Sequence, residues 1–220
     1  MNSMKRPKII INCAMSADGK IASPSRKQIR LSCDDDILRM YKLRDEYDAV
    51  LVGIETILSD DPKLTVKEKY VENPKQPVRI ILDSECRTPI DALAVNEWAK
   101  TIIFTLDKCN KKFKDNVEVV NCKADENGFI DLKEILEILF NRKIKTLMVE
   151  GGGTVIWSFL NKGFVDDLFV YIAPIIIGGA NTPTLADGKG IKVLDNIIPL
   201  KIMDIKRLGP GVLFHYRLIK

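Results

Sequence analysis

The sequence predicts an α/β protein, and three patterns lead to this prediction. Short runs rich in β-branched residues recur along the chain, as expected for strands buried on both faces of a mostly parallel sheet. Segments with helical spacing of apolar residues lie between these runs and are expected to flank the sheet. Near the C-terminus, two apolar runs surround the turn sequence Leu208–Gly211, which predicts an antiparallel hairpin at one edge of the sheet.

The expected strands and helices alternate through nearly the whole chain. Six runs predict the parallel part of the sheet: Ile9–Cys13, Ala49–Val52, Val78–Leu82, Thr101–Phe104, Val117–Val120 and Thr146–Val149. Three runs predict the closing part: Leu168–Ile177, which Pro174 breaks, Ile202–Arg207 and Val212–Leu218. Helices are expected over roughly Asp34–Glu46, in a short segment between Gly53 and Pro62, from Leu132, and from Gly153 or Thr154. This alternation favours a single domain over residues 1–220.

Composition and charge exclude several classes of protein. The chain has 34 Lys and Arg and 30 Asp and Glu, and its net charge of +4 is too small and too dispersed to indicate nucleic-acid binding. No apolar run approaches the roughly 20 residues that a membrane helix needs. The run Ile9–Ile11 is too short for the apolar part of a signal peptide, so we expect a cytoplasmic protein.

The five cysteines and the single histidine offer little for metal or nucleophilic chemistry. No two cysteines have C-x-x-C spacing, so neither a zinc site nor a disulfide framework is expected, and the thiols are predicted to be reduced and buried. His215 lies within the last predicted strand, where a core or surface role is expected. A Ser-His-Asp or Cys-His mechanism therefore lacks a base, and the sequence indicates no catalytic residue.

The glycine run Gly151–Gly153 is the strongest local signal. It follows a predicted strand and precedes an amphipathic helix, where backbone N–H groups and the helix dipole favour an anion such as a pyrophosphate. A tight turn between strand and helix is the alternative, although one glycine would suffice for it. The run is not the dinucleotide fingerprint G-x-G-x-x-G, because Ile156 stands at the third glycine position.

Three further segments place polar side chains at the ends of predicted strands. Thr56 and Asp60 follow the strand that ends at Gly53 and would share one face of a short helix. Asn12 stands at the end of a buried strand and needs a hydrogen-bond partner, which a ligand can supply. Ser84 and Arg87 follow another strand and suit a 2′-phosphate, although a solvated loop explains them equally well.

Taken in order, these segments resemble the riboflavin-biosynthesis reductase family, whose members have a dihydrofolate-reductase-like fold. The residues that carry the resemblance are Ala14-Met-Ser-x-Asp-Gly-Lys-Ile-Ala22, Val52-Gly-x-x-Thr-x-x-x-Asp-Asp-Pro-x-Leu-Thr65, Arg79-Ile-Ile-Leu-Asp-Ser84, Val149-Glu-Gly-Gly-Gly153 and Pro174-x-x-x-Gly-Gly179. Together they cover nearly the whole chain. The set is more specific than any one segment.

The resemblance implies a site for NADPH, with NADH as an alternative, and a site for a small phosphorylated substrate. The implied cofactor contacts are Ala14, Thr56, Asp60, Leu82, Asp83, Ser84, Gly151, Gly152, Gly153 and Thr154. The substrate contacts implied by the resemblance, with Asn12 added from its strand-end position, are Asn12, Arg44, Leu64, Lys67 and Glu150. Lys67 stands where bacterial members of the family carry arginine. The resemblance also suggests a homodimer.

The deaminase motifs H-x-E and P-C-x-x-C, which many bacterial relatives carry in a fused domain, are absent from this sequence. The chain is therefore similar to the stand-alone archaeal and fungal members, which reduce the ribosyl group before deamination. This resemblance implies that the substrate is 2,5-diamino-6-ribosylamino-4(3H)-pyrimidinone 5′-phosphate and that hydride attacks C1′ of a ring-opened imine. A dihydrofolate or pterin reductase of the same fold and a non-catalytic nucleotide-binding protein are the alternatives.

Overall fold

A computed structural model describes residues 5–219 of the chain, apart from the side chain of Asp195. The chain divides into two compact units. The first comprises the segment that ends at Lys8 together with Tyr41–Met148, and the second comprises Ile9–Met40 and the chain from Val149 onward. The single domain expected over residues 1–220 stays a prediction.

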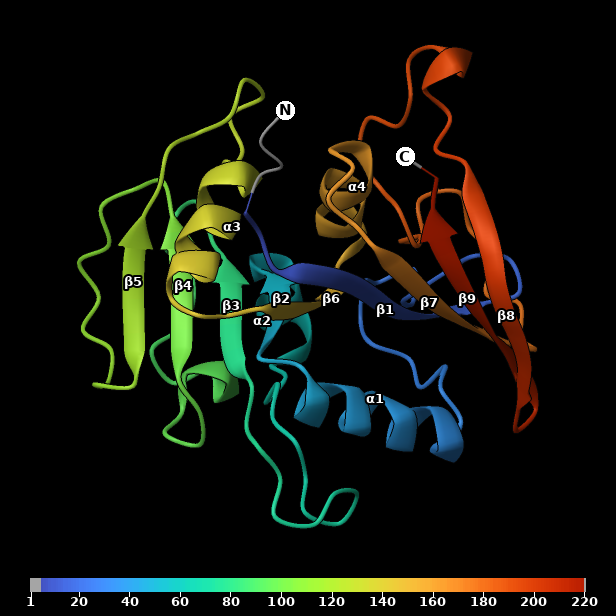
Figure 1. Cartoon of the computed structure of the whole chain (residues 1–220), viewed down its shortest axis with the longest axis horizontal. Coiled ribbons are helices and arrows are strands. Elements are labelled where there is room, and N and C mark those ends of the chain that lie inside the picture. Colours follow the sequence, from blue (N-terminus) through green and yellow to red (C-terminus); the bar gives the residue numbers. More distant parts are fainter. Residues whose placement is uncertain (1–4, 220) are drawn as a thin grey trace. The chain divides into compact units, whose positions relative to one another are not determined.

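The first unit contains four parallel strands. They are hydrogen-bonded in the order β5-β4-β3-β2 and are coloured from lime to cyan in Figure 1. Their bounds are β2 Ala49–Gly53, β3 Val78–Leu82, β4 Thr101–Thr105 and β5 Val117–Asn121. The unit also contains α2 Ile54–Asp60, α3 Leu132–Asn141 and a short 3-10 helix, Leu93–Val95.

The second unit contains a mixed arrangement of strands in the order β1-β7-β9-β8 (Figure 1). Strands β1 and β7 are parallel, whereas β9 runs antiparallel to both β7 and β8. The bounds are β1 Lys8–Ser16, β7 Asp167–Ala173, β8 Leu200–Leu208 and β9 Gly211–Leu218. Helix α4 Gly153–Asn161 and a 3-10 turn at Leu194–Asn196 belong to the same unit. The residues of α1 Asp34–Glu46 and β6 Thr146–Gly151 divide between the two units.

The predicted α/β class, the mostly parallel strands and the C-terminal hairpin are confirmed. Two details differ from the prediction. The run Val117–Val120 is only half-buried, because β5 is an outer strand with β4 as its neighbour. The run Leu168–Ile177 ends as a strand at Ala173, immediately before Pro174, which lacks the N–H that a strand needs. None of the helices described between residues 5 and 219 is long and apolar enough to cross a bilayer.

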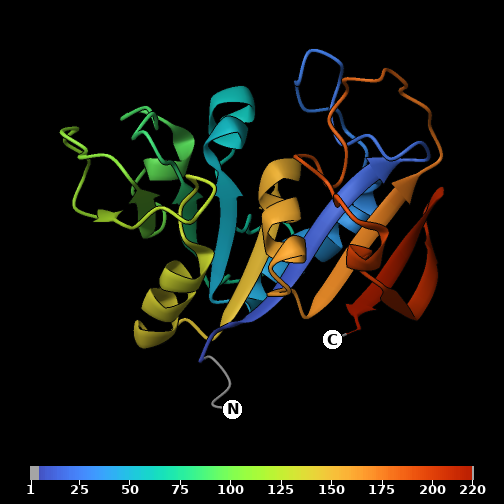
Figure 2. The ribbon, with the colours of Figure 1, turned by 90° about the horizontal axis from the view of Figure 1, so that it is seen from above.

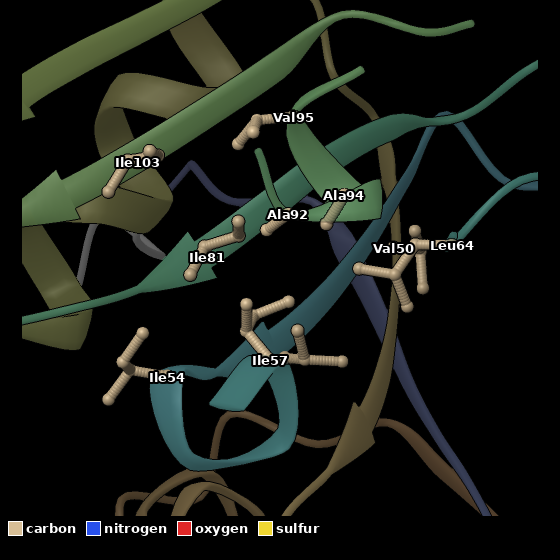
Figure 3. Packing of buried hydrophobic residues seen from close by; sticks show 10 residues of the cluster. Val50, Ile54, Ile57, Leu64, Ile81, Ala92, Ala94, Val95 and Ile103 are labelled. Atoms are coloured by element: carbon tan, nitrogen blue, oxygen red, sulfur yellow. The ribbon is translucent and has the colours of Figure 1, made fainter. Parts of the chain in front are cut away.

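The core of the first unit lies between strands β2 to β4 and the short helix α2. Figure 3 shows Val50, Ile81 and Ile103 from the strands near Ile54 and Ile57 of α2. Leu64 joins this cluster and is 1% exposed, so its side chain is a core residue. Its φ of 54° lies in the left-handed region, which turns the chain back after α2.

Cys86 and Cys109 form a disulfide, so the prediction that all five thiols are reduced is wrong for this pair. Their Cα atoms are 5.6 Å apart. Cys86 follows β3 and Cys109 follows β4, and the parallel pairing of these strands brings both loops to the same end. Of the remaining cysteines, Cys13 and Cys122 are buried and Cys33 is partly buried.

Thiol counting tests this disulfide directly. Unfolded protein that has never met a reductant should release three reactive thiols per chain, and reduction should raise the number to the five that the sequence contains. The measurement is a colorimetric thiol titration in guanidinium chloride. Five thiols before reduction would contradict the bond. A Cys86→Ser variant is the control, because it should lose the difference.

Candidate functional site

Candidate residues of the first unit lie where β2 and β3 end. Gly53 and Leu82 are partners in the register of these two parallel strands, so the segments that follow them start at the same edge. Helix α2 begins directly after Gly53 and carries Thr56 and Asp60, both partly exposed. Leu82 and Ser84 are partly exposed at the end of β3. Open α/β sheets bind ligands at the carboxyl ends of their strands, so this edge suits a nucleotide.

Asp83 has a structural role in the loop that follows β3. Its side chain is fully buried, and its carboxylate accepts hydrogen bonds from the backbone N–H of Arg87 at 2.9 Å and from Thr88. The Thr88 N–H and hydroxyl are both 2.7 Å from Asp83 Oδ2. These bonds shape the loop that presents Ser84. The contact of Asp83 with a cofactor stays a prediction.

Arg87, the candidate for a 2′-phosphate, forms ion pairs within the first unit. Its guanidinium donates to Glu55 on α2 and lies 3.7 Å from Glu85. The hydrogen bond to Glu55 is the main reason why the pKa of Arg87 is raised. The Arg87 side chain is 41% exposed, so an anion reaching it competes with two carboxylates. Of the two candidates Ser84 and Arg87, Ser84 is therefore the better suited to a 2′-phosphate.

Two predicted substrate contacts, Arg44 and Lys67, lie beside the ring of Tyr41. The Arg44 guanidinium is 5.5 Å and the Lys67 ammonium 5.6 Å from the ring centroid. Arg44 also donates to the carbonyl of Thr65 at 3.1 Å, next to Leu64. Two cations held beside one aromatic ring suit an anionic group such as a phosphate. Sequence reasoning missed Tyr41, although its position three residues before Arg44 on a helix was a usable signal.

The glycine run in the second unit forms the turn between β6 and α4. Gly151 has a φ of 126°, which side-chain-bearing residues rarely adopt. A Cβ on Gly153 would lie 2.5 Å from the carbonyl oxygen of Thr184 and 2.9 Å from a carboxylate oxygen of Asp187. Backbone geometry and packing therefore account for two of the three glycines. Gly152 has a φ of −70°, which residues with a side chain also adopt, so its backbone conformation does not require glycine.

Helix α4 has an N-cap residue, Gly152, that supplies no side-chain cap, and its own first turn contains no acidic residue. The carboxylate of Asp187 lies beside Gly153, so an anion bound at this turn has an acidic neighbour. The N–H groups of a first turn lack helical partners and carry the positive end of the helix dipole. Thr154 is exposed in the same turn. The uncapped N–H groups of this turn suit a phosphate. The phosphate contact at Gly151–Thr154 stays a prediction.

On β1, the candidates Asn12 and Ala14 occupy alternate positions and so face the same side. Asn12 is 9% exposed, and its Oδ1 accepts a hydrogen bond from Arg39 at 2.6 Å. Between the two candidates, Cys13 is buried, and its burial, with the carboxylates of Asp36 and Glu150, raises its thiol pKa to about 12. Glu150 therefore lies in the electrostatic surroundings of β1.

Asp18 joins two of the sequence segments that carry the family resemblance. Its carboxylate accepts hydrogen bonds from the N–H groups of Ile177 at 3.1 Å and Gly178 at 2.6 Å, and from Ser16. Figure 2 shows the chain after β1, in blue, beside the chain after β7, in orange. A bridge between Lys20 and Thr184 continues this contact. The loop that touches Gly153 is thus tied to the Asp18 turn.

The pKa of Asp18 makes this tie testable. The hydrogen bonds from Ser16 and Ile177 lower the pKa of Asp18 from 3.8 to about 2. Because the folded pKa is depressed, the stabilisation is fully present above pH 3.8 and is lost as the pH falls through about 2. NMR titration of the Asp18 carboxyl should give a midpoint near pH 2. A midpoint at the ordinary value would contradict the tie, and Asp18→Asn should speed hydrogen exchange at Gly178.

The strand-end residues and the uncapped glycine turn are features of α/β proteins that bind phosphorylated ligands. The model of the RibD C-terminal domain family matches residues 7–214, and the chain belongs to this family.

Relatives of the chain include stand-alone proteins and larger ones. A protein of Archaeoglobus fulgidus named 2,5-diamino-6-ribosylamino-4(3H)-pyrimidinone 5′-phosphate reductase is 37% identical over 214 residues, which cover 94% of this chain and 95% of the relative. A protein of the same name from Aquifex aeolicus is 35% identical, with 90% and 91% covered. The RibD protein of Actinobacillus pleuropneumoniae is 35% identical, but the match covers only 58% of its length.

Solved structures show the same fold. A deaminase/reductase of Thermotoga maritima superposes with a TM-score of 0.84 at 25% identity, covering 98% of this chain and 57% of the other. The riboflavin biosynthesis reductase Rib7 of Saccharomyces cerevisiae gives a TM-score of 0.79 at 21% identity, with 100% and 93% covered.

Proposed function

We propose that this chain is a cytoplasmic NADPH-dependent reductase of riboflavin biosynthesis. Its substrate would be 2,5-diamino-6-ribosylamino-4(3H)-pyrimidinone 5′-phosphate and its product the ribitylamino form. One observation carries the proposal. A stand-alone relative that is named as that reductase matches the chain over 95% of the relative's length. The proposal needs no deaminase domain, and the 220 residues contain no deaminase motif.

The proposed cofactor contacts are those that the family resemblance implies, and each unit is described by itself. In the first unit they are Thr56, Asp60, Leu82, Asp83 and Ser84, and in the second they are Ala14, Gly151, Gly152, Gly153 and Thr154. The uncapped first turn of α4 supports a phosphate contact in the second unit. The hydroxyl of Ser84, at the end of β3, suits the ribose or its phosphate. Both NADPH and NADH carry the groups that such contacts recognise.

The substrate contacts proposed here are Asn12, Arg44, Leu64, Lys67 and Glu150. Arg44 and Lys67, which share the ring of Tyr41, suit the 5′-phosphate. Leu64 belongs to the core, so its contribution would be to place the backbone of the neighbouring segment. Asn12 and Glu150 offer an amide and a carboxylate to sugar hydroxyls or to the pyrimidine.

The reaction requires little covalent chemistry from the protein. Opening of the ribosyl ring gives an imine between C1′ and the exocyclic nitrogen of the substrate. When bound, NADPH supplies the hydride that C1′ accepts. The nitrogen takes a proton, and Glu150 is the proposed group for holding or relaying it. The remaining residues orient the substrate and exclude water.

The assay follows NADPH absorbance with the purified chain. Oxidation is expected with the ribosylamino-pyrimidinone phosphate, and no oxidation is expected with dihydrofolate. Turnover of dihydrofolate alone would favour a pterin reductase, and no oxidation with either would favour a nucleotide-binding protein. The same assay with NADH gives the cofactor preference. A Glu150→Gln variant with unchanged turnover would remove Glu150 from the proton step.

The homodimer is also a proposal, and the outer strand β8 supports it. Residues 200–207 of β8 are exposed, and among them Ile202 and Ile205 are 53% and 54% exposed. An outer strand with apolar side chains is suited to contact with another chain. Sedimentation should give twice the mass of one chain, and Ile205→Glu should reduce the mass to that of one chain. A wild-type monomer would contradict the proposal.

A further inference from the structure

A hydrogen-bonded series of side chains connects helix α1 to Asn12 on β1. Ser32 donates to Asp36 at 2.6 Å, and Asp36 accepts from Arg39 at 2.9 and 2.7 Å. Arg39 then donates to Asn12 Oδ1 at 2.6 Å. Asp36 is 2% exposed, so the pair is largely removed from water. All four residues belong to the second unit.

The chemistry of Arg39 fixes the orientation of the Asn12 amide. A guanidinium only donates, so the amide atom that faces Arg39 must be the oxygen Oδ1. The nitrogen Nδ2 therefore points the other way as a donor, and it has no partner among the residues from 5 to 219. An amide held in this way offers a ligand hydrogen atoms rather than a lone pair.

The neighbouring strands hold Arg39 in place. Its guanidinium lies 5.8 Å from the ring centroid of Phe169 on β7, and that ring stacks on His215 at 4.3 Å between centroids. The His215 ring is held in turn by Asp167 through a 2.9 Å hydrogen bond. Asn12 on β1 and Phe169 on β7 are register partners, so Arg39 contacts two neighbouring residues of adjacent strands. His215 thus supports a ring and is not placed as a base.

Arg39 carries a second donor without an acceptor. Arg39 Nη1 is buried and lacks a hydrogen-bond partner within the described part of the chain. A buried donor without a partner costs free energy, so native sites usually fill it. Nη1 of Arg39 and Nδ2 of Asn12 are therefore two donors with unused capacity. An oxygen-rich ligand supplies the acceptors that these donors lack.

We propose that Arg39 is a positioning residue that sets the Asn12 amide so that Nδ2 donates to an oxygen of the substrate, either a sugar hydroxyl or the pyrimidinone carbonyl. This inference rests on the proposed function. Asp36 and Ser32 act through Arg39 by fixing its guanidinium. The arrangement selects substrates with an acceptor at this point.

The Asn12→Asp variant removes the donor and keeps the shape. A carboxylate still accepts from Arg39, so the fold should be retained, whereas no hydrogen remains for the substrate. We expect the KM for the pyrimidinone phosphate to rise about tenfold or more, as for a lost hydrogen bond. The KM for NADPH should be unchanged. Asn110→Asp, an exposed position, is the matched control.

The Arg39→Lys variant tests positioning. A lysine keeps the charge beside Asp36 but lacks the planar fork that holds Asp36 and Asn12 together. We expect a higher KM for the pyrimidinone phosphate. In the double variant, which combines Asn12→Asp with Arg39→Lys, the KM should be no higher than that of the single variant with the higher KM. Arg142→Lys, in an exposed pair with Glu118, is the control.

The outcomes separate this inference from the proposed function. No turnover by the wild type overturns both. Wild-type turnover with an unchanged KM in Asn12→Asp overturns the inference alone. Additive effects in the double variant, or a lower melting temperature of Arg39→Lys with unchanged KM, leave Arg39 a purely structural residue and also overturn it.

Discussion

Replacing Arg79 with methionine is expected to lower the free energy of unfolding by about 3–5 kcal/mol. The Arg79 side chain is fully buried in β3, and burial lowers the pKa of its guanidinium to about 10. Its guanidinium donates to neutral oxygens of neighbouring segments, namely those of Lys63, Leu93, Asn96, Ala99 and Thr101. Methionine fills much of the volume but leaves these acceptors without donors.

Urea denaturation followed by circular dichroism and tryptophan fluorescence measures the effect. Coincident curves from the two probes justify a two-state analysis. Arg142→Met is the matched control, because the Arg142–Glu118 pair is 31% and 41% exposed. It should cost no more than about 1 kcal/mol, as surface ion pairs do. Equal losses in the two variants would contradict the prediction, because the buried hydrogen bonds of Arg79 would then stabilise the fold no more than an exposed ion pair does.

The strands could be predicted because runs of apolar, β-branched side chains indicate burial directly. Val78–Leu82 has the predicted bounds, and the helix expected over Asp34–Glu46 is α1 without a shift. Each β-branched run needs only a neighbouring strand and helices that cover the sheet, and the prediction does not depend on which strand or helices these are. The buried role of Arg79 could not be predicted from this pattern, because one charged residue in an apolar run does not show which carbonyls will surround it.

The loops were not predictable, because distant parts of the chain hold them. Asp18 accepts from Gly178, 160 residues away, and Lys20 forms a bridge with Thr184. The Cys86–Cys109 bond likewise depends on two strands pairing first. Local spacing carries no information about such partners.

The candidate site shows the same division. Strand-end positions such as Thr56 and Ser84 followed from the alternation of strands and helices. The hydrogen bond of Arg39 to Asn12, 27 residues apart, did not, and neither did the ring of Tyr41 beside Arg44 and Lys67. Helical spacing shows which residues share a face, but only the fold shows which strand that face covers.

Two alanine substitutions in the glycine turn are expected to separate folding from cofactor binding. In Gly153→Ala, the new Cβ would lie 2.5 Å from the Thr184 carbonyl oxygen, so the backbone must shift. We expect a loss of about 1–3 kcal/mol in the free energy of unfolding, as for overpacking. In Gly152→Ala, the φ of −70° is one that alanine adopts. We expect a smaller loss of stability but NADPH binding weaker by about tenfold or more, because the methyl group meets the phosphate.

Isothermal titration with NADPH and thermal unfolding give the two readouts for each variant. Gly163→Ala, just beyond the other end of α4, is the control, since its Cβ would meet nothing within 4 Å. Its φ of 68° should cost about 1–2 kcal/mol of stability and leave NADPH affinity unchanged. If Gly152→Ala binds NADPH as tightly as the wild type, the turn serves only to join β6 to α4, and the phosphate must be bound elsewhere. If it binds weakly while remaining stable, the absent side chain of Gly152 is explained by the ligand.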